Sequence, residues 1–170
     1  MTEFVLRPSI PDDLSDIARI YSHYVLHTSA TFEIDPPSRE EMAKRRSHVL
    51  TLGLPYLTAE EHGAVIGYAY AHLYRPRAAY RFTVEDSIYV DPKHAGKGCG
   101  QTLLTALISA CEKGPWRQMI AVIGDSENLA SIGLHRRCGF RDIGTLNSVG
   151  FKFDRWVDSV LMQRELAGKK

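Results

Sequence analysis

The sequence predicts a mixed α/β fold in which one sheet is flanked by helices. Three observations indicate this: short apolar or alternating runs typical of strands, longer runs with the apolar spacing of helices, and an alternation of the two after an early hairpin. The length of 170 residues suits one domain, so a single domain over residues 1–170 is expected. The predicted order of elements is β-α-α-β-β-β-α-β-α-β-β.

The elements of the first half follow from apolar spacing and capping signals. They are a strand at residues 4–7, a helix from 11 to about 24, a helix from 38 to about 50, and hairpin strands at 55–59 and 64–74. Ser38 followed by Glu41 has the spacing of a capping box, which predicts a helix start. Gly63 indicates a hairpin turn with a positive φ. The first helix has one apolar face, made by Leu14, Ile17, Ile20, Tyr21 and Tyr24.

The second half alternates strands and helices. Strands are predicted at residues 81–90 and 118–123, followed by closing strands at 140–149 and 156–164. A helix is predicted at residues 128–137, and Cys138-Gly139 is typical of its end. The helix that follows Gly100 has one apolar side, made by Leu103, Leu104, Leu107, Ile108 and Cys111.

Composition excludes several classes of function. A net charge of +1 gives no basic surface for nucleic acid. Residues 1–7 lack a cationic lead before a long apolar run, and no stretch approaches 18 apolar residues, so neither export nor a membrane span is expected. Three cysteines without CxxC spacing favour reduced thiols in a cytoplasmic protein. His23 and His27 have helical spacing but no third ligand, so no metal site is expected.

The turn from His94 to Gly100 predicts a site for an anion. Glycines at 96, 98 and 100 remove side chains where a ligand approaches the backbone, and the next helix start points free N-H groups there. A P-loop would need a Lys-Ser/Thr pair, and a dinucleotide fingerprint would need an acidic residue about 20 positions on. Both are absent, so two interpretations of the turn remain: a site for a phosphate-containing ligand of another kind, and a plain connection between a strand and a helix.

Two stretches resemble the GNAT superfamily of acyl-CoA-dependent acetyltransferases. Residues 88–94 before the glycines, with 102–104 after them, resemble its pyrophosphate-binding motif, and residues 128–140 resemble its later helix. Nearly the whole chain is similar to the phosphinothricin, methionine sulfoximine and L-amino acid N-acetyltransferase family. Further similar stretches are 31–32, 77–85, 121–124, 150–152 and 156–158. Ala95 departs from the Gln or Arg that commonly opens the glycine motif, which removes one side-chain anchor.

The resemblance implies a GNAT-like fold with one mixed, mostly antiparallel sheet, and acetyl-CoA as cosubstrate. In this family the strand before the glycine turn separates from its neighbour, which leaves backbone N-H groups free for the thioester oxygen. Such an N-H donor stabilises the transition state by about 3 kcal/mol. Asn128 is expected to cap a helix and to bind the pantetheine or phosphate arm. The expected acetyl-CoA ligands are Ile88, Tyr89, Val90, Gly96, Lys97, Gly98, Cys99, Gly100, Gln101, Asn128 and Arg137. Lys97 and Arg137 are equally plausible as surface charges.

Two residues are expected to move protons. Glu85 matches the glutamate proposed as general base in the family, with an ion-paired strand carboxylate as the alternative. A carboxylate is about 4 pKa units too weak a base for an amine, so burial, the neighbour Asp86 or a water relay must help it. His135 stands where many superfamily members carry a tyrosine that protonates the thiolate. A neutral imidazole donates one N-H, and the alternative is a histidine hydrogen-bonded into the helix interface.

A substrate amino acid brings a carboxylate, which a guanidinium group binds well. Arg75, Arg77 and Arg81 are expected at alternating positions of a strand beside Glu85, and so on one face. Arg77 and Tyr80 are the favoured substrate contacts. The other expected contacts are Thr31, Phe32, Ala79 and Lys152.

Two other functions would use the same acyl-CoA cradle: a protein N-terminal or lysine acetyltransferase, and a non-catalytic acyl-CoA sensor. Loops 28–37 and 74–80 look able to close over a small ligand, which favours a small amine, and Glu85 argues against a sensor. The resemblance implies a homodimer paired through the C-terminal half. The apolar side chains expected at that contact are Trp156, Val157, Val160 and Leu161. Neither a nucleic acid nor a membrane is an expected partner.

Overall fold

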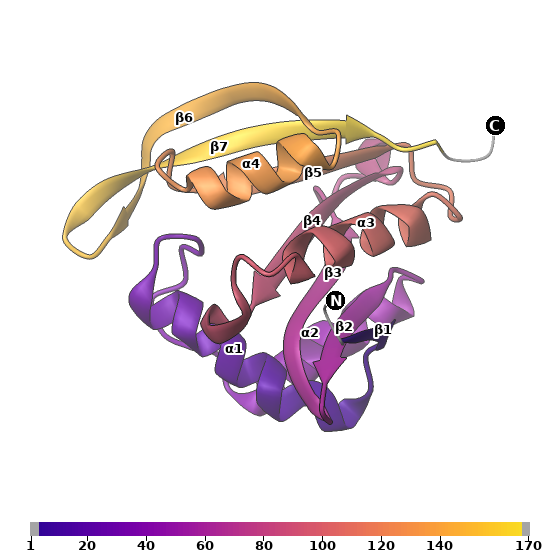
Figure 1. Cartoon of the computed structure of the whole chain (residues 1–170). Helices are drawn as coiled ribbons and strands as arrows, with labels where there is room; N and C mark the ends of the chain where they lie inside the picture. The colour runs from indigo at the N-terminus through magenta and orange to yellow at the C-terminus, as the bar shows by residue number, and fades with distance from the viewer. Residues whose placement is uncertain (1–3, 168–170) are drawn as a thin grey trace.

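The computed structural model describes residues 4–167, which contain one seven-stranded sheet and four α-helices (Figure 1). The strands are β1 (Val5–Pro8), β2 (Tyr56–Glu61), β3 (Ala64–Leu73), β4 (Thr83–Val90), β5 (Gln118–Gly124), β6 (Arg141–Lys152) and β7 (Arg155–Glu165). The helices are α1 (Leu14–His27), α2 (Arg39–Thr51), α3 (Cys99–Cys111) and α4 (Leu129–Arg137). None of the helices in this part of the chain has the length and hydropathy of a bilayer span.

The strands lie in the order β1-β2-β3-β4-β5-β7-β6. All neighbours are antiparallel except β4 and β5, which run parallel. The predicted order of elements and the mixed, mostly antiparallel sheet are therefore confirmed. The hairpin turn at His62-Gly63 has the positive φ values that its sequence indicated.

The predicted strand ends were wrong at β4 and at the closing hairpin, each for a local reason. β4 begins at Thr83 rather than at residue 81, because the preceding segment is an exposed loop containing a 3-10 turn, η2 (Ala78–Tyr80). Pro76 lacks an N-H for strand pairing, which favours a loop there. The closing hairpin extends to Lys152 and Arg155, because Phe153 and Asp154 both take positive φ and make a two-residue turn.

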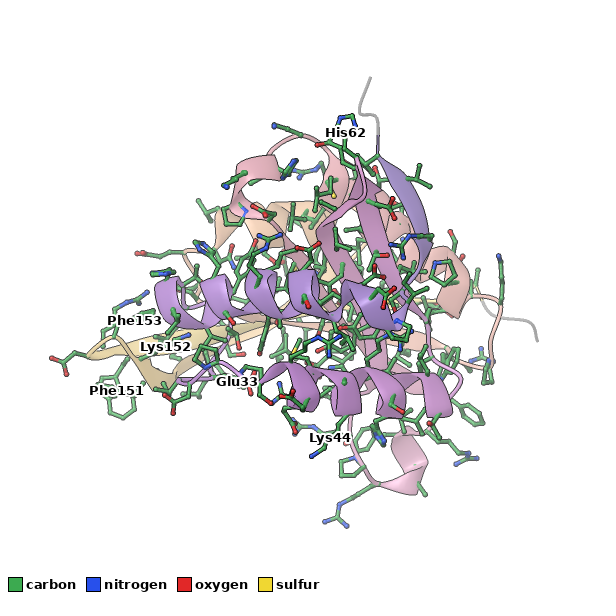
Figure 2. All side chains as sticks on the ribbon, turned by 90° about the horizontal axis from the view of Figure 1, so that it is seen from below. Glu33, Lys44, His62, Phe151, Lys152 and Phe153 are labelled. Atoms are coloured by element: carbon green, nitrogen blue, oxygen red, sulfur yellow. The ribbon has the colours of Figure 1, made fainter. Side chains whose placement is uncertain are left out.

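Helices cover both faces of the sheet. On β4, the Tyr89 ring packs against Tyr21 and Tyr24 of α1, whereas the side chain of its neighbour Val90 points toward Gly100 in α3. Because adjacent strand residues point to opposite faces, α1 and α3 lie on opposite sides. Figure 2 shows α1 and α2 side by side in front of the sheet. The predicted apolar face of α3 is buried in full, and that of α1 is buried except for the half-buried Tyr24.

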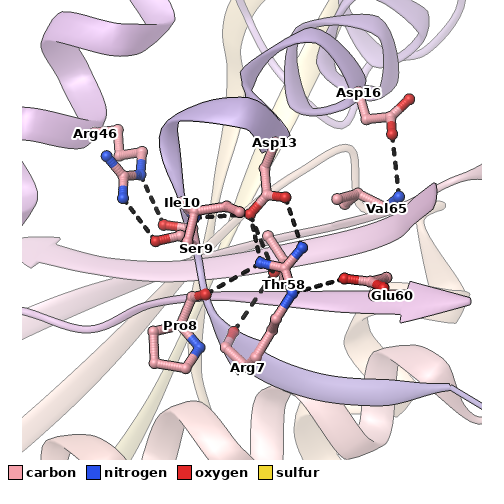
Figure 3. Close-up of polar contacts among 10 residues, drawn as sticks. All are labelled: Arg7, Pro8, Ser9, Ile10, Asp13, Asp16, Arg46, Thr58, Glu60 and Val65. Atoms are coloured by element: carbon pink, nitrogen blue, oxygen red, sulfur yellow. Dashed lines mark hydrogen bonds and ion pairs between the residues drawn. The ribbon is translucent and has the colours of Figure 1, made fainter. Parts of the chain in front are cut away.

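A polar cluster fixes the N-terminal edge of the sheet (Figure 3). The Arg7 guanidinium on β1 binds the carboxylates of Asp13 and Glu60, both at 2.7 Å. Nearby, Arg46 of α2 donates to the hydroxyl of Ser9 at 2.8 Å. These contacts link β1, β2 and α2, and they lie away from the central strands.

The sheet opens in its middle, where β4 and β5 separate. They pair only through residues 83–85 of β4 and 118–120 of β5. β4 nevertheless remains paired with β3 up to Val90. A gap therefore begins directly after Glu85, and the resemblance implied such a separation.

Candidate active site

A cavity of about 820 Å³ occupies the gap between β4 and β5. Its size is typical of small-molecule sites. It is bordered by the end of β4, the glycine turn, β5, the start of α4 and the loop after α1. The expected site residues that it brings together are Thr31, Phe32, Glu85, Ile88, Tyr89, Val90, Gly96, Gly98, Gly100, Gln101, Asn128, His135 and Arg137.

Backbone N-H groups on β4 point into this gap from alternate residues. The N-H of Asp91 donates to the carbonyl of Ile66 in β3 at 2.8 Å. The backbone N-H groups of successive residues in an antiparallel strand point alternately to its two sides, so the N-H of Tyr89 also points toward β3. The N-H groups of Ile88 and Val90 point into the gap. Tyr89 is among the expected acetyl-CoA ligands, but pairing with β3 uses its N-H, so of the three strand residues expected as ligands only Ile88 and Val90 offer a free N-H.

The glycine turn is shaped by backbone conformation. Gly96 and Gly98 have φ values of 75° and 86°, which side-chain-bearing residues rarely adopt. Gly98 is the N-cap of α3, so the free N-H groups of that helix start there. Gly98 lines the cavity, and a Cβ on it would meet no protein atom within 4 Å. A Cβ on Gly100 would make only ordinary contacts.

Two of the expected acetyl-CoA ligands do not line the cavity. The Cys99 side chain is buried in the core under α3, and Lys97 is exposed. Asn128 is in place as the predicted cap, since its side-chain oxygen accepts the N-H of Ser131 at 3.2 Å. Arg137, two residues after His135, lines the cavity.

Glu85 is the last β4 residue paired with β5, and its carboxyl group faces the cavity. Burial raises its pKa to about 7, the charge of Asp86 adds to the shift, and Arg75 opposes it. His72 lies opposite on β3, with its Nε2 atom 3.7 Å from the Glu85 carboxylate. Sequence reasoning missed His72, and strand register is the signal that reveals it. A carboxyl group tuned in this way can accept a proton from an amine near neutral pH.

His135 forms a buried pair with Asp86 on the other face of the sheet. Its Nε2 atom lies 3.0 Å from a carboxylate oxygen of Asp86, and the two side chains are 3% and 2% exposed. Its Nδ1 atom lies 2.8 Å from the carbonyl oxygen of Ser131. Burial lowers the pKa of His135, but the Asp86 carboxylate and the Ser131 carbonyl raise it more, so the net shift is upward. This partnership could not be read from the sequence.

The loop after α1 is docked against the β6–β7 hairpin. Lys152 donates to the carbonyl oxygen of Thr31 at 2.7 Å, and the Tyr21 hydroxyl lies 2.9 Å from the Thr31 hydroxyl. Lys152 is buried and does not line the cavity, and burial lowers its pKa. Figure 2 shows Lys152 near the hairpin turn, beside Phe153. The contacts of Lys152 therefore hold Thr31 in the cavity wall.

Arg77, Ala79 and Tyr80 lie outside the cavity lining. They belong to the exposed loop around η2, so the expectation that the arginines share one face of a strand was wrong. Tyr80 is 43% exposed and packs edge-on against Tyr74. Arg75 nevertheless acts on Glu85, because its charge lowers the pKa of that carboxyl group.

Gly124→Ala is expected to disturb the docked loop. A Cβ at Gly124 would overlap the carbonyl oxygen of Ser29, so the loop must move. Overpacking of this kind lowers stability by about 1–3 kcal/mol. Displacement of the loop that carries Thr31 should also weaken substrate binding, and a loss of about 1.4 kcal/mol there is about a 10-fold higher KM. Gly144→Ala is the control, because a Cβ there meets no atom within 4 Å. Equal KM values for the two variants, from initial rates, would contradict the docking of this loop at the substrate site.

The sequence model of the acetyltransferase (GNAT) family matches residues 17–140. The chain belongs to the GNAT family. The resemblance seen in the glycine motif and the later helix is thereby confirmed. As in the expected GNAT arrangement, the glycine turn, the separated strands and the start of α4 surround one cavity.

Relatives with named activities resemble the GNAT chain over most of its length. It is 59% identical to phosphinothricin N-acetyltransferase of Alcaligenes faecalis, covering 91% of this chain and 79% of the relative. It is 41% identical to L-methionine sulfoximine/L-methionine sulfone acetyltransferase of Salmonella typhimurium, covering 91% and 90%. A phosphinothricin acetyltransferase from Sinorhizobium meliloti, solved in complex with AcCoA, superposes with a TM-score of 0.94 at 49% identity, covering 99% and 91%.

Proposed function

We propose that this GNAT protein transfers the acetyl group of acetyl-CoA to the α-amino group of a small amino-acid-like substrate. Phosphinothricin, methionine sulfoximine, methionine sulfone and related L-amino acids are the proposed class, which the named relatives support. The observation that carries the proposal is Glu85, a carboxyl group with a pKa of about 7 facing the cavity where β4 leaves β5. An amine acceptor needs a base with such a pKa.

The residues of the cavity fit acetyl-CoA. Open space beside Gly98 and the free N-H groups at the start of α3 suit the pyrophosphate, with Gly96, Gly100 and Gln101 around them. Asn128 and Arg137 are proposed to contact the pantetheine arm and a phosphate. Lys97 remains a proposal for a phosphate outside the cavity, and Cys99 supports the turn from the core side.

The bound thioester supplies an activated acetyl group, and the protein supplies donors and a base. Ile88 and Val90 are proposed to donate their backbone N-H groups to the thioester oxygen, an oxyanion-type contact. Glu85 takes the proton of the attacking amine. Direct attack in a ternary complex is favoured over a thiol carrier, because burial raises the pKa of Cys99 to about 11 and that of Cys111 to about 12.

The substrate pocket is proposed to lie between the docked loop and the η2 segment. Thr31 and Phe32 line the cavity directly, and Lys152 acts by holding Thr31. Arg77 is proposed to bind the substrate carboxylate, together with neighbouring residues of its loop, Ala79 and Tyr80. The effect of Arg75 on Glu85 supports the nearness of this basic segment to the reacting amine.

A substrate panel tests the proposed function. The protein is incubated with acetyl-CoA and free amino acids, phosphinothricin, methionine sulfoximine, methionine sulfone, or peptides with a free N-terminus or lysine. We expect CoA release with the small amines and little with peptides. Faster turnover of peptides would favour a protein acetyltransferase, and tight acetyl-CoA binding without turnover of any amine would favour a sensor.

The pH dependence of kcat should show the ionisation of Glu85. A general base works as the carboxylate, and its raised pKa keeps it protonated below about 7. We therefore expect kcat to rise with pH through a limb near 7. Initial rates at saturating amine and acetyl-CoA measure this limb, and a limb near the ordinary carboxylate range would contradict the tuned base.

We propose a homodimer as well, with a corrected contact surface. Val157 and Val160 are buried within the subunit, so they are unavailable to a partner. Trp156 is 65% exposed, and its ring packs against the exposed Phe151 on the same hairpin. Light scattering at micromolar concentration is expected to give the mass of a dimer for the wild-type protein and a smaller mass for Trp156→Asp. A monomeric wild type would contradict the proposal.

We also propose that residues 1–170 form one domain of a cytoplasmic protein. One continuous sheet runs through the part of the chain that the structure describes, which supports one domain. Cys99, Cys111 and Cys138 are buried free thiols, which suits a reducing compartment. A small-molecule amine and a second subunit remain the proposed partners.

A further inference from the structure

The buried pair of Asp86 and His135 lies beside the cavity, on the opposite face of the sheet from Glu85. Both residues contribute to the cavity wall. Adjacent strand residues point to opposite faces, so Glu85 and Asp86 approach the β4–β5 gap from opposite sides. The second carboxylate oxygen of Asp86 is buried without a hydrogen-bond partner, so His135 is the group that compensates the buried carboxylate.

The contacts of His135 determine where its protons lie. The Ser131 carbonyl oxygen can only accept, so the Nδ1 atom of His135, 2.8 Å away, carries a proton. A neutral imidazole with that proton has a bare Nε2 atom and nothing to donate there. A proton on Nε2 requires the imidazolium form, and a carboxylate 3.0 Å away stabilises that form. The expectation that neutral His135 donates to the thiolate is therefore corrected.

We propose, resting on the proposed function, that Asp86 is a positioning residue that holds His135 as an imidazolium whose Nε2 proton goes to the departing thiolate. The pair would then supply the acid on one side of the gap, while Glu85 supplies the base on the other. Asp86 acts only through His135 and contacts neither the amine nor the thioester in this proposal.

Protons and charge balance through this step. The amine nitrogen forms a bond to the acetyl carbon and gives one proton to Glu85, which becomes neutral. The carbon-sulfur bond breaks, its electron pair stays on sulfur, and that thiolate takes the Nε2 proton of His135, which leaves its hydrogen bond to Asp86. His135 becomes neutral, and its pair with Asp86 gains one negative charge as Glu85 loses one. Transfer of the Glu85 proton through solvent back to His135 restores the starting state.

The surrounding charges support the imidazolium form. Asp86 raises the pKa of His135, whereas burial opposes it, and the net shift is upward. Phe140 packs edge-on against the His135 ring and helps to exclude water from the pair. The Asp86 carboxylate also acts on titratable groups of β3, β4, α3 and the end of α4, namely His72, Glu85, Cys111 and Cys138.

Kinetics of Asp86→Asn test the positioning role. The amide keeps the shape of the side chain but cannot balance an imidazolium, so kcat should fall about 100-fold with little change in the KM for acetyl-CoA. Deprotonation of the His135 imidazolium should lower kcat at alkaline pH, and this decline should begin at lower pH in Asp86→Asn, because the pKa of His135 falls without the carboxylate. Asp142→Asn is the control, since Asp142 is an exposed partner of Arg136. Wild-type kcat and pH profile in Asp86→Asn would overturn the proposal.

A double variant separates positioning from structure. In the background of His135→Gln, adding Asp86→Asn should lower kcat by no more than about twofold, because Asp86 has no imidazolium left to hold. A second large loss in that background would assign Asp86 an independent role and overturn the proposal.

Nitrogen NMR of the full chain labelled with 15N-histidine gives a readout besides activity. The His135 resonances are assigned by their loss in His135→Gln, so no folded Asp86 variant is needed. We expect both ring nitrogens of His135 to be protonated at neutral pH. A neutral His135 ring would overturn the proposal even if acetyl transfer is observed. An imidazolium in a protein that transfers no acetyl group would refute the proposed function, but the charged form of the Asp86–His135 pair would stand.

Discussion

Glu85→Gln is expected to lower kcat by about 100-fold or more, the effect of removing a general base. The amide keeps the size of the side chain at the end of the β4–β5 pairing but cannot accept the proton of the amine. Binding of acetyl-CoA should change little, because the proposed contacts of that ligand lie further along β4 and at the glycine turn. Steady-state rates and calorimetric affinity for acetyl-CoA measure the two effects separately.

Glu165→Gln is the matched control for this experiment. Glu165 is an exposed strand carboxylate at the end of β7, opposite Gln118 and outside the cavity lining. Its loss should leave both kcat and affinity unchanged. If Glu85→Gln kept the wild-type kcat from about pH 6 to about pH 9, Glu85 would be a structural carboxylate and the proposed base would be lost.

Gly98→Val is expected to weaken acetyl-CoA binding by about 10-fold or more. Its side chain would enter the open space beside the start of α3, where backbone N-H groups are proposed to meet the pyrophosphate. Loss of one hydrogen bond to a charged group costs about 1.5–3 kcal/mol. The φ of 86° adds strain of about 1–2 kcal/mol, so thermal stability should fall as well.

Gly53→Val separates strain from ligand contact. Gly53 follows α2 with a φ of 71°, and a Cβ there also meets no atom within 4 Å, but the residue lies outside the cavity lining. This control should lose comparable stability and keep its affinity, as measured by calorimetry. If folded Gly98→Val kept full affinity for acetyl-CoA, the glycine turn would only connect β4 to α3 and would not bind the ligand. If that variant does not fold, Gly98→Ala carries the same test with a smaller side chain.

The sequence predicted the order of the elements because their signals are local. The buried face of α3, the Ser38 cap and the turn at Gly63 all arise from residues close together in the chain. The η2 segment was misread because strand-like composition around Arg81 hid the effect of Pro76. The closing hairpin was too short in the prediction, because Phe153-Asp154 lacks the glycine that usually marks such a turn.

The site was predictable in part, for the same reason. Glu85, Asn128 and the glycine turn were found through motifs, and the structure places all of them at one cavity. The partners His72 and Asp86 were not found as partners, because register across β3 and packing of α4 bring them close. Such contacts join residues far apart in the chain, and one sequence without its fold contains no local signal for them.

Product analysis after incubation with acetyl-CoA and methionine sulfone tests the central claim most directly. Mass spectrometry should detect sulfone acetylated on its α-amino group, one released CoA for each product, and protein without a covalent acetyl group. Direct attack in a ternary complex predicts this combination, with initial rates that depend jointly on both substrates. An acetylated protein intermediate, or CoA release without an acetylated small amine from any member of the substrate panel, would contradict the account.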